Sequence, residues 1–430
     1  MADKKRIYLC LAHMSEAGLE QKYIKEAFDT NWVVPLGPNV NGFEADLEAF
    51  VNEIPAQGRN EAPLAKRVVA LSSGTAAVHL ALINCGVKAG DEVCVQSFTF
   101  CASSHPITYL GATPIFIDSE KDTWNMDPEL LEEAIKDRIA KTGKKPKAIV
   151  PVALYGMPYQ INKIMAIANK YDIPVVEDAA EGFGSRWKGQ VLGTFGKYGV
   201  LSFNGNKMIT TSGGGALVTN NEEDWREIMM YATQYRESYP YYQHEKIGFN
   251  YRMSNICAGI GRGQMTVVND HIAHHKHVQK IYEDLLADVP GIHVHAQPAT
   301  GEYDSNYWLC TITLDENVKI KGQENAYKTI VQGAVGGAAG VIHAASSAVT
   351  DCQPNDNVEA LRVFMDAAGI EARPVWKPMH KQPVYKNCPA YVNGVSEAIF
   401  KVGMCLPAGP YVSDEDVKYI VETIKSAIVA

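Results

Sequence analysis

The sequence predicts an α/β fold, in which a mostly parallel sheet is covered by helices on both faces and a smaller α+β domain follows toward the C-terminal end. Between residues 68 and 219, apolar runs of strand length alternate with segments of helix length. Such alternation implies crossover connections, which place helices on both faces of a parallel sheet. At 430 residues, the chain is long for one compact unit and suits a large domain with a smaller one.

Seven apolar runs are predicted as strands of the sheet: 68–71, 92–97, 113–118, 148–153, 175–178, 199–203 and 216–219. Asp127-Pro128 places a cap residue before a proline, which predicts the start of a helix. After about Asp270 the pattern changes to a helix near Ile272, a strand-like run over 307–314 and a helix over 357–369. We therefore expect a large domain over residues 1–270 and a small domain over residues 271–430.

Composition and charge favour a small molecule as the partner. The formal net charge of −9 argues against the broad basic surface that binding of nucleic acid or of an anionic membrane needs. Nine cysteines without a C-x-x-C pair, together with an N-terminus that does not resemble an export signal, predict a cytoplasmic protein. Residues 330–349 carry no charge over about a bilayer's length. They are mostly Gly, Ala and Ser, and Gln332 and His343 interrupt the run, so no membrane span is predicted.

Residues 72–77 follow the first predicted strand and open a helix. Free backbone N–H groups and the positive end of the helix dipole face whatever lies at such a turn, and Gly74 permits close approach. This predicts a phosphate-binding turn, although many strand-to-helix turns are rich in Gly and Ser for steric reasons alone. The Gly-x-Gly-x-x-Gly pattern of a dinucleotide-binding turn is missing from it.

Asp178 and Lys207 are the candidate catalytic residues. Asp178 ends an apolar run and is expected at the ligand-binding edge of the sheet, where a carboxylate can keep a pyridine nitrogen protonated; a helix cap or a surface acid is the alternative. Lys207 lies among glycines and small polar residues. Lysine forms an imine with an aldehyde and, as a free amine, can move a proton. The ordered set of phosphate turn, aspartate and lysine favours pyridoxal 5′-phosphate (PLP) over a solvated surface lysine.

Several blocks in this order resemble the PLP-dependent sugar aminotransferases of the DegT/DnrJ/EryC/StrS family. They are Gly37-Pro38 with Phe43-Glu44, Ser73–Ala77, Gly90–Val93, Gly111–Pro114, Glu177–Ala180, Ser202–Lys207, Gly248–Met253 and Arg373–His380. The resemblance spans nearly the whole chain. It implies a type I aminotransferase fold, PLP as the cofactor, and transfer of an amino group from an amino acid, L-glutamate by resemblance, to a nucleotide-linked keto-sugar. It also implies a homodimer with shared active sites.

The resemblance further implies roles for single residues. Lys207 matches the lysine that binds PLP as a Schiff base, and Asp178 matches the partner of the pyridine nitrogen. The matching phosphate ligands are Gly74, Thr75 and Ser202, with Asn250 reaching the phosphate from the neighbouring subunit. Phe100 matches a ring stacked on the cofactor, although from the sequence alone it would be a core residue. Arg252 matches a group of the partner chain near the substrate.

Glu181 stands where many relatives have His or Gln beside the phenolic oxygen of PLP. A carboxylate facing a phenolate would be repelled unless it is protonated or turned toward the substrate, so cofactor contact and another role both stay open. Trp376, Lys377 and His380 lie in a stretch that resembles a substrate-binding segment, with a surface loop as the alternative. The cluster over residues 274–277 has no acid or cysteine at ligand spacing, which predicts a solvated helix face and no metal site.

The block over residues 202–215 resembles relatives that act on UDP-linked 4-keto-6-deoxy-N-acetylhexosamines, precursors of amino sugars in surface glycans. One alternative is a sugar dehydratase on the same scaffold, in which histidine replaces the lysine; Lys207 argues against it. Another is a non-catalytic sugar-nucleotide-binding or regulatory protein. The Gly/Ala-rich segment over about 322–355 does not resemble the usual family pattern.

Overall fold

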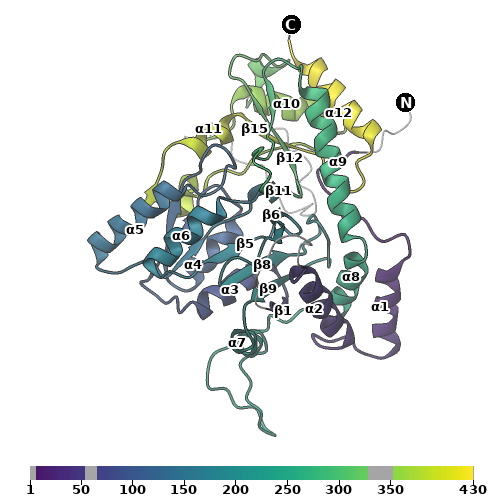
Figure 1. The fold of residues 1–430 in the computed structure, drawn as a ribbon. Coiled ribbons are helices and arrows are strands. Elements are labelled where there is room, and N and C mark those ends of the chain that lie inside the picture. The colour runs from purple at the N-terminus through teal and green to yellow at the C-terminus, as the bar shows by residue number, and fades with distance from the viewer. Residues whose placement is uncertain (1–5, 54–64, 328–351, 430) are drawn as a thin grey trace.

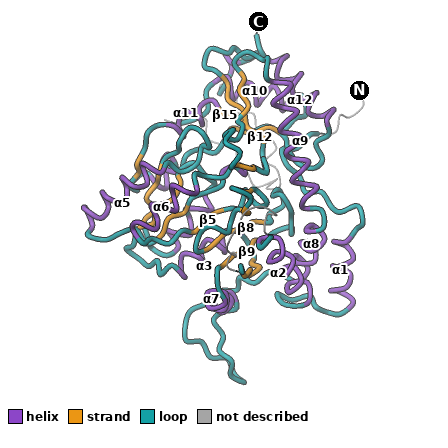
Figure 2. The backbone as a smooth tube through the Cα atoms, in the orientation of Figure 1, coloured by secondary structure: helices purple, strands orange, loops and turns teal. Residues whose placement is uncertain are grey.

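The computed structural model describes residues 6–53, 65–327 and 352–429. A central sheet with helices around it forms the larger part of the molecule, and a smaller sheet with its own helices lies beside the C-terminus (Figure 1). The strands of both sheets are visible as short segments within a tube that is otherwise mostly helix and loop (Figure 2). The predicted α/β fold class is confirmed.

The strands of the central sheet run in the order β1-β9-β8-β5-β4-β2-β3-β14, because bridges from residues 149 and 152 join β4 to β5. Their bounds are β1 (Arg67–Leu71), β2 (Glu92–Gln96), β3 (Thr113–Ile117), β4 (Ala148–Val150), β5 (Val176–Asp178), β8 (Tyr198–Ser202), β9 (Gly215–Thr219) and β14 (Ala390–Tyr391). β9 is antiparallel to both of its neighbours, and the other pairs in this sheet are parallel. All seven predicted strands are present, with ends that shift by up to three residues.

Alternate residues of these strands enter two different hydrophobic cores, one on each face of the sheet. In β1, Val68 and Ala70 pack in one core, whereas Val69 and Leu71 pack in the other. The first core includes residues of α2 (Pro38–Val51), α5 (Pro128–Thr142) and α6 (Ile161–Tyr171). The second includes residues of α3 (Gly74–Asn84), α4 (His105–Tyr109) and α7 (Glu222–Ala232). Because side chains alternate along a strand, a sheet buried on both faces needs apolar residues at nearly every position.

Helix starts follow the predicted chemistry. The Asp127 carboxylate accepts hydrogen bonds from the backbone N–H groups of Glu129 and Leu130, and Pro128 is the first residue of α5. Ser73 caps α3 in the same way, since its Oγ accepts a bond from the N–H of Ala76 at 3.0 Å. The helix starts predicted at Asp127-Pro128 and after residue 72 are therefore confirmed.

A third hydrophobic core belongs to the smaller sheet, which is antiparallel in the order β10-β12-β15-β13. Its strands are β10 (Ile292–Val294), β12 (Cys310–Leu314), β13 (Arg373–Pro374) and β15 (Gly403–Leu406), and its helices are α9 (Val268–Leu286), α10 (Asp356–Ala367), α11 (Val395–Val402) and α12 (Asp414–Ala427). Near the N-terminus, Ile7 bridges to Ile370 and packs on this core. The proposed boundary between domains at residue 270 stays a prediction.

The remaining elements connect these parts. α1 (Leu19–Asp29) and α2 pack on α8 (Asn255–Met265), and α9 runs from α8 along one side of the molecule to the smaller sheet (Figure 1). A three-stranded sheet consists of β6 (Arg186–Trp187), β7 (Gln190–Val191) and β11 (Tyr303–Asp304). Single 3₁₀ turns lie at η1 (Cys101–Ser103), η2 (Leu154–Gly156), η3 (Gln323–Asn325), η4 (Met379–Lys381) and η5 (Pro383–Tyr385).

The prediction that residues 274–277 form a solvated helix face is wrong for His275. His275 is fully buried in α9, and its Nδ1 lies 3.1 Å from the carbonyl oxygen of Tyr307. Helical spacing places His275 on the same buried face as Ile272 and Val278. Within the described ranges, no group of three or more His, Cys, Asp or Glu side chains is placed to hold a metal ion.

No helix among the described residues is long and apolar enough to cross a membrane. The uncharged stretch over residues 330–349 lies outside the described residues, as does most of the atypical segment over 322–355.

The burial of His275 predicts a loss of stability in mild acid. Burial lowers the pKa of His275 to about 3, whereas an unfolded histidine has a pKa near 6.5. Below about pH 6.5 the unfolded chain therefore binds a proton that the folded chain does not, so the free energy of unfolding falls as the pH falls. Between about pH 7.5 and pH 5.5 this group accounts for a loss of about 1–2 kcal/mol.

Denaturant unfolding of His275→Gln at both pH values checks this prediction, since the variant should lose less stability on acidification than the parent. Ala273→Ser, at an exposed position of the same helix without a titratable side chain, is the control and should keep the parental pH dependence. Equal pH dependence in parent and His275→Gln would contradict the assignment.

Candidate active site

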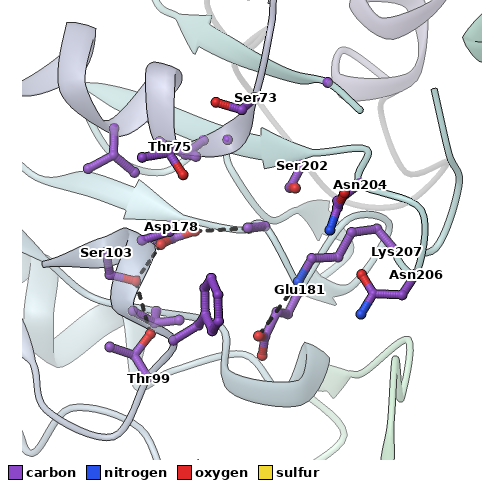
Figure 3. Close-up of a pocket in the computed structure, with 18 of the residues that line it drawn as sticks. Ser73, Thr75, Thr99, Ser103, Asp178, Glu181, Ser202, Asn204, Asn206 and Lys207 are labelled. Atoms are coloured by element: carbon purple, nitrogen blue, oxygen red, sulfur yellow. Dashed lines mark hydrogen bonds and ion pairs between the residues drawn. The ribbon is translucent and has the colours of Figure 1, made fainter. Parts of the chain in front are cut away.

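A cavity of about 420 Å³ lies at the carboxyl ends of β1, β5 and β8, where ligands of parallel sheets bind. Trp308 and Trp376, which flank strands of the smaller sheet, complete its wall. The predicted site residues that line the cavity are Gly74, Thr75, Phe100, Asp178, Glu181, Ser202 and Lys207 (Figure 3). Segments more than 100 residues apart in the sequence therefore meet here.

The predicted phosphate turn lies at one end of the cavity, at the start of α3. The backbone there is packed so closely that side chains are excluded. A Cβ atom on Gly215 would lie 2.4 Å from the backbone nitrogen of Gly74, and a Cβ on Gly74 would lie 3.1 Å from the Cβ of Ser202. The glycines hold the ends of β8 and β9 against the turn, so the Ser202 hydroxyl and the first N–H groups of α3 face the same space.

Asp178 ends β5 and is held by two donors. The Ser103 hydroxyl donates to its Oδ2 at 2.6 Å, and the N–H of Ala180 donates to its Oδ1 at 3.1 Å. The Ser103 hydroxyl also lies 2.9 Å from that of Thr99. Burial raises the pKa of Asp178, and these hydrogen bonds oppose that rise. A fixed carboxylate in a buried cavity is suited to pair with a cationic group of a ligand.

Lys207 extends into the cavity from the loop between β8 and β9. The loop is held by the N–H of Lys207, which donates to the carbonyl of Asn204 at 2.9 Å. The Lys207 Nζ lies 3.6 Å from Oε1 of Glu181 and 3.8 Å from the centre of the Trp308 ring. The lysine predicted from the sequence and the aspartate predicted to accompany it therefore line one cavity.

Trp308 was not predicted as a site residue. It precedes β12, and from the sequence an isolated tryptophan beside an apolar run is expected to belong to the hydrophobic core. Its indole N–H donates to the carbonyl of Asn206 at 2.6 Å, which fixes the ring beside the lysine loop. The sequence contains no local signal of this contact, because the two residues are about a hundred positions apart.

Glu181 faces Lys207 across the cavity (Figure 3). Its Oε2 accepts a hydrogen bond from the N–H of Tyr155 at 2.7 Å. Burial raises the pKa of Glu181, and the charge of Lys207 opposes that rise. Tyr155 has a left-handed backbone, with φ of 53°, which is uncommon for a residue with a side chain. The sequence left two roles open for Glu181, contact with the cofactor or another role. In the structure, its carboxylate contacts Lys207.

Two aromatic rings lie at the mouth of the cavity. The Phe100 ring is 49% exposed and lies 5.3 Å from the centre of the Trp376 ring. The hydroxyl of Tyr155 accepts a hydrogen bond from the N–H of Trp376 at 2.7 Å, which ties the substrate-binding segment predicted from the sequence to η2. Phe100 was predicted as a cofactor contact, and its exposed ring leaves a face open for one.

The other predicted site residues lie away from the cavity wall. His380 is held between Ser97, 2.6 Å from its Nδ1, and Glu397, 3.1 Å from its Nε2. Lys377 is half-buried in the turn that precedes His380. A role for these two side chains in substrate binding stays a prediction.

Asn250 is exposed, and Arg252 pairs with Glu44 within the same chain at 2.5 Å. Their predicted role in the site of a neighbouring subunit also stays a prediction.

The comparisons of this chain with known proteins all indicate the same family. The model of the DegT/DnrJ/EryC1/StrS aminotransferase family matches residues 15–329 and 323–425. The chain is 40% identical over 424 residues to "Putative pyridoxal phosphate-dependent aminotransferase EpsN" of Bacillus subtilis (strain 168), covering 98% of this chain and 95% of the relative. It is 31% identical over 417 residues to GDP-perosamine synthase of Escherichia coli O157:H7, covering 97% and 98% of the two chains.

Among solved structures, a DegT DnrJ EryC1 StrS aminotransferase from Brucella abortus is similar over 95% of both chains, with a TM-score of 0.78 and 26% identity.

Gly215→Ala tests the close packing at the phosphate turn. The added methyl group would press on the backbone of residues 73 and 74, so we expect the affinity of the apo-protein for PLP to fall about tenfold or more. Absorbance titration with PLP measures this. Gly205→Ala is the matched control, because Gly205 does not line the cavity and a Cβ there meets only the carbonyl oxygen of Ser212 at 3.8 Å, so its affinity should be close to that of the parent. Equal affinities for the two variants would contradict this account of the turn.

Proposed function

Since the chain belongs to the DegT/DnrJ/EryC1/StrS aminotransferase family, we propose that it transfers the amino group of L-glutamate to a UDP-linked 4-keto-6-deoxy-N-acetylhexosamine. The enzyme is a PLP-dependent sugar aminotransferase; the donor and the particular sugar nucleotide are the proposed part. The observation that carries the proposal is that Lys207, Asp178 and the turn at Gly74 line one cavity.

The cavity residues fit PLP. The turn at Gly74, the Thr75 side chain and the Ser202 hydroxyl would bind its phosphate, and Phe100 offers an open aromatic face to its ring. Asp178, fixed by Ser103 and Ala180, would keep the ring nitrogen protonated. When bound, PLP supplies an electron sink for the negative charge that develops at the substrate carbon.

The chain's own residues supply proton transfer and orientation. Lys207 is the base, because an amine on a flexible side chain can take a proton from the substrate carbon and deliver it elsewhere in the cavity. Trp308 and Trp376 cover the cavity from the smaller sheet and exclude water from the site of proton transfer. Two half-reactions at one site predict ping-pong kinetics.

One observation supports a nucleotide-linked acceptor: the block over residues 202–215 resembles that of enzymes acting on UDP-linked 4-keto-6-deoxy-N-acetylhexosamines. A GDP-linked keto-sugar is the second candidate, because GDP-perosamine synthase of Escherichia coli O157:H7 aligns with almost the whole chain. With the UDP-linked acceptor, we infer that the enzyme works in the cytoplasm, in the synthesis of amino sugars for surface glycans.

A homodimer with shared sites is part of the proposal. Asn250 is exposed and lies at the base of the loop that follows α7, where it bridges to Thr233. The loop itself projects from the body of the molecule (Figure 1). We infer that Asn250 reaches the phosphate in the second chain's cavity and that Arg252 supports it. Mixing an Asn250→Ala chain with a Lys207→Ala chain should restore activity in part, because one intact site forms in the mixed dimer.

The donor and acceptor are tested with purified holoenzyme. L-Glutamate alone should bleach the visible absorbance of the cofactor and release one equivalent of 2-ketoglutarate per site, because the first half-reaction needs no sugar. Subsequent addition of UDP-, GDP- and dTDP-linked 4-keto-6-deoxy sugars should restore the absorbance, most rapidly with the UDP-linked N-acetylhexosamine. Faster restoration with a GDP-linked sugar would favour the second candidate, and dehydration without amine transfer would contradict both.

Asp178→Asn tests the carboxylate at the end of β5. The amide keeps the shape but not the charge, so we expect kcat to fall by about 100-fold or more, as for other fixed electrostatic groups. Asp172→Asn is the matched control, since the Asp172 side chain is fully exposed, and it should retain parental kcat. Near-parental kcat in Asp178→Asn would contradict the role of this acid, just as full turnover in Lys207→Ala would contradict that of the lysine.

A further inference from the structure

The Lys207 amine lies between two groups to which the proposed chemistry gives no role toward the lysine itself. On one side is the Glu181 carboxylate, with Oε1 3.6 Å from Nζ. On the other is the face of Trp308, whose ring centre is 3.8 Å from Nζ. The side chains of Lys207 and Glu181 are only 13% and 4% exposed. An ammonium this far from water needs compensating partners, and these two supply a charge and a π face.

Glu181 is fixed in place independently of the lysine. Its second oxygen accepts the N–H of Tyr155 at 2.7 Å, and its backbone carbonyl accepts a bond from the Asn306 side chain at 3.0 Å. The left-handed backbone of Tyr155 costs free energy and persists where the surrounding structure requires it. Here that conformation accompanies an N–H bond to the buried carboxylate.

Trp308 is fixed equally firmly. Its indole N–H donates to the carbonyl of Asn206, and its backbone N–H donates to Oδ1 of Asn306 at 2.8 Å. Asn306 therefore contacts both halves of the arrangement, through the carbonyl of Glu181 and the N–H of Trp308. Asn306 thus links the backbones of Glu181 and Trp308, and the lysine amine lies between their two side chains.

We propose that Glu181 and Trp308 form a holding site for the Lys207 ammonium, occupied when the lysine is free of the cofactor and carries a proton, as it does after taking one from the substrate carbon. The inference rests on the proposed function, in which the amino donor releases the lysine in each cycle. A released lysine that swung freely would lose its position, whereas a lysine held by two fixed partners stays within reach of the reacting carbon. Glu181 and Trp308 are positioning residues in this account, since they act through Lys207.

The other titratable groups near the site come from four further elements. Asp178 at the end of β5 interacts with both Lys207 and Glu181, Tyr155 belongs to η2, and Cys10 belongs to the N-terminal segment. A fourth element, β15, contributes Cys405, which interacts with Glu181 and Tyr155. Burial raises the pKa of Cys10 and of Cys405 to about 12 and that of Tyr155 far above its usual range, so all three stay neutral near pH 7. Lys207 thus faces two carboxylates, and Glu181 is the one in ion-pair contact with it.

The holding site is tested in the cofactor-free protein by trace acetylation, with the extent of modification of each lysine read by mass spectrometry. Only the neutral amine reacts, so a carboxylate that stabilises the ammonium protects Lys207. In Glu181→Gln we expect Lys207 to be labelled roughly tenfold faster, relative to the exposed Lys163, because an opposite charge within about 4–6 Å shifts a proton equilibrium by one to three powers of ten.

Matched variants separate the two contacts. Trp308→Phe keeps an aromatic face and should label Lys207 up to about twofold faster, whereas Trp308→Leu removes the face and should label it several-fold faster. Glu302→Gln breaks the exposed pair of Glu302 with Lys188 and should leave Lys207 labelling unchanged. Should Glu181→Gln fail to fold, Glu181→Asp withdraws the carboxylate by one methylene and should give an intermediate increase.

Unchanged Lys207 labelling in Glu181→Gln, or in Glu181→Asp where only that variant folds, would overturn the holding site. The labelling involves neither cofactor nor substrate, so its outcome is independent of which sugar accepts the amine. If the glutamate half-reaction fails while the labelling follows the expected order, the proposed function falls and the contact between acid, ring and lysine stands.

Discussion

Burial of charge in one cavity is the constraint on which the rest of the site depends. Asp178 and Glu181 are carboxylates with at most about a twentieth of their surface exposed, and Lys207 is the cation that both of them face. Leaving a buried charge without a partner costs several kcal/mol. With both acids ionised and the lysine protonated, the three groups sum to one negative charge. A cofactor with a protonated ring nitrogen would supply the missing positive charge, and the helix end at Gly74 would bind its phosphate, since a negative charge is favoured there.

The fold meets this constraint with contacts from both sheets. The central sheet supplies the aspartate, the serine and the lysine loop from the ends of β5 and β8, while the approach to the smaller sheet supplies Trp308. Tyr155 connects the two parts, because its N–H binds Glu181 and its hydroxyl accepts the N–H of Trp376. Movement of the smaller sheet relative to the central one would therefore disturb the acid that faces the lysine.

The sequence predicted what depends on local order and missed what depends on distant contacts. Strands, the helix start after residue 72, the cap at Asp127 and the positions of Asp178 and Lys207 follow from patterns within a few residues, and these lie as expected. The contact of Trp308 with Lys207 joins segments that are far apart in the sequence, and no periodic pattern of residues predicts it. His275 is a different kind of error: its helical spacing from Ile272 and Val278 indicated a buried face, but its neighbouring histidines and lysine suggested a solvated one.

Arg252 shows how a residue can match a family position and still be constrained by its own chain. Its side chain is 9% exposed, and its guanidinium binds both oxygens of Glu44 and the carbonyl of Ala70. A guanidinium neutralised by a carboxylate has little charge left for a distant substrate. The same contacts attach the segment containing Asn250 to β1 and α2, and a rigid base is what an exposed asparagine needs to reach a neighbouring cavity in one fixed position. The arginine therefore fits better as the support of a shared site than as a ligand within it.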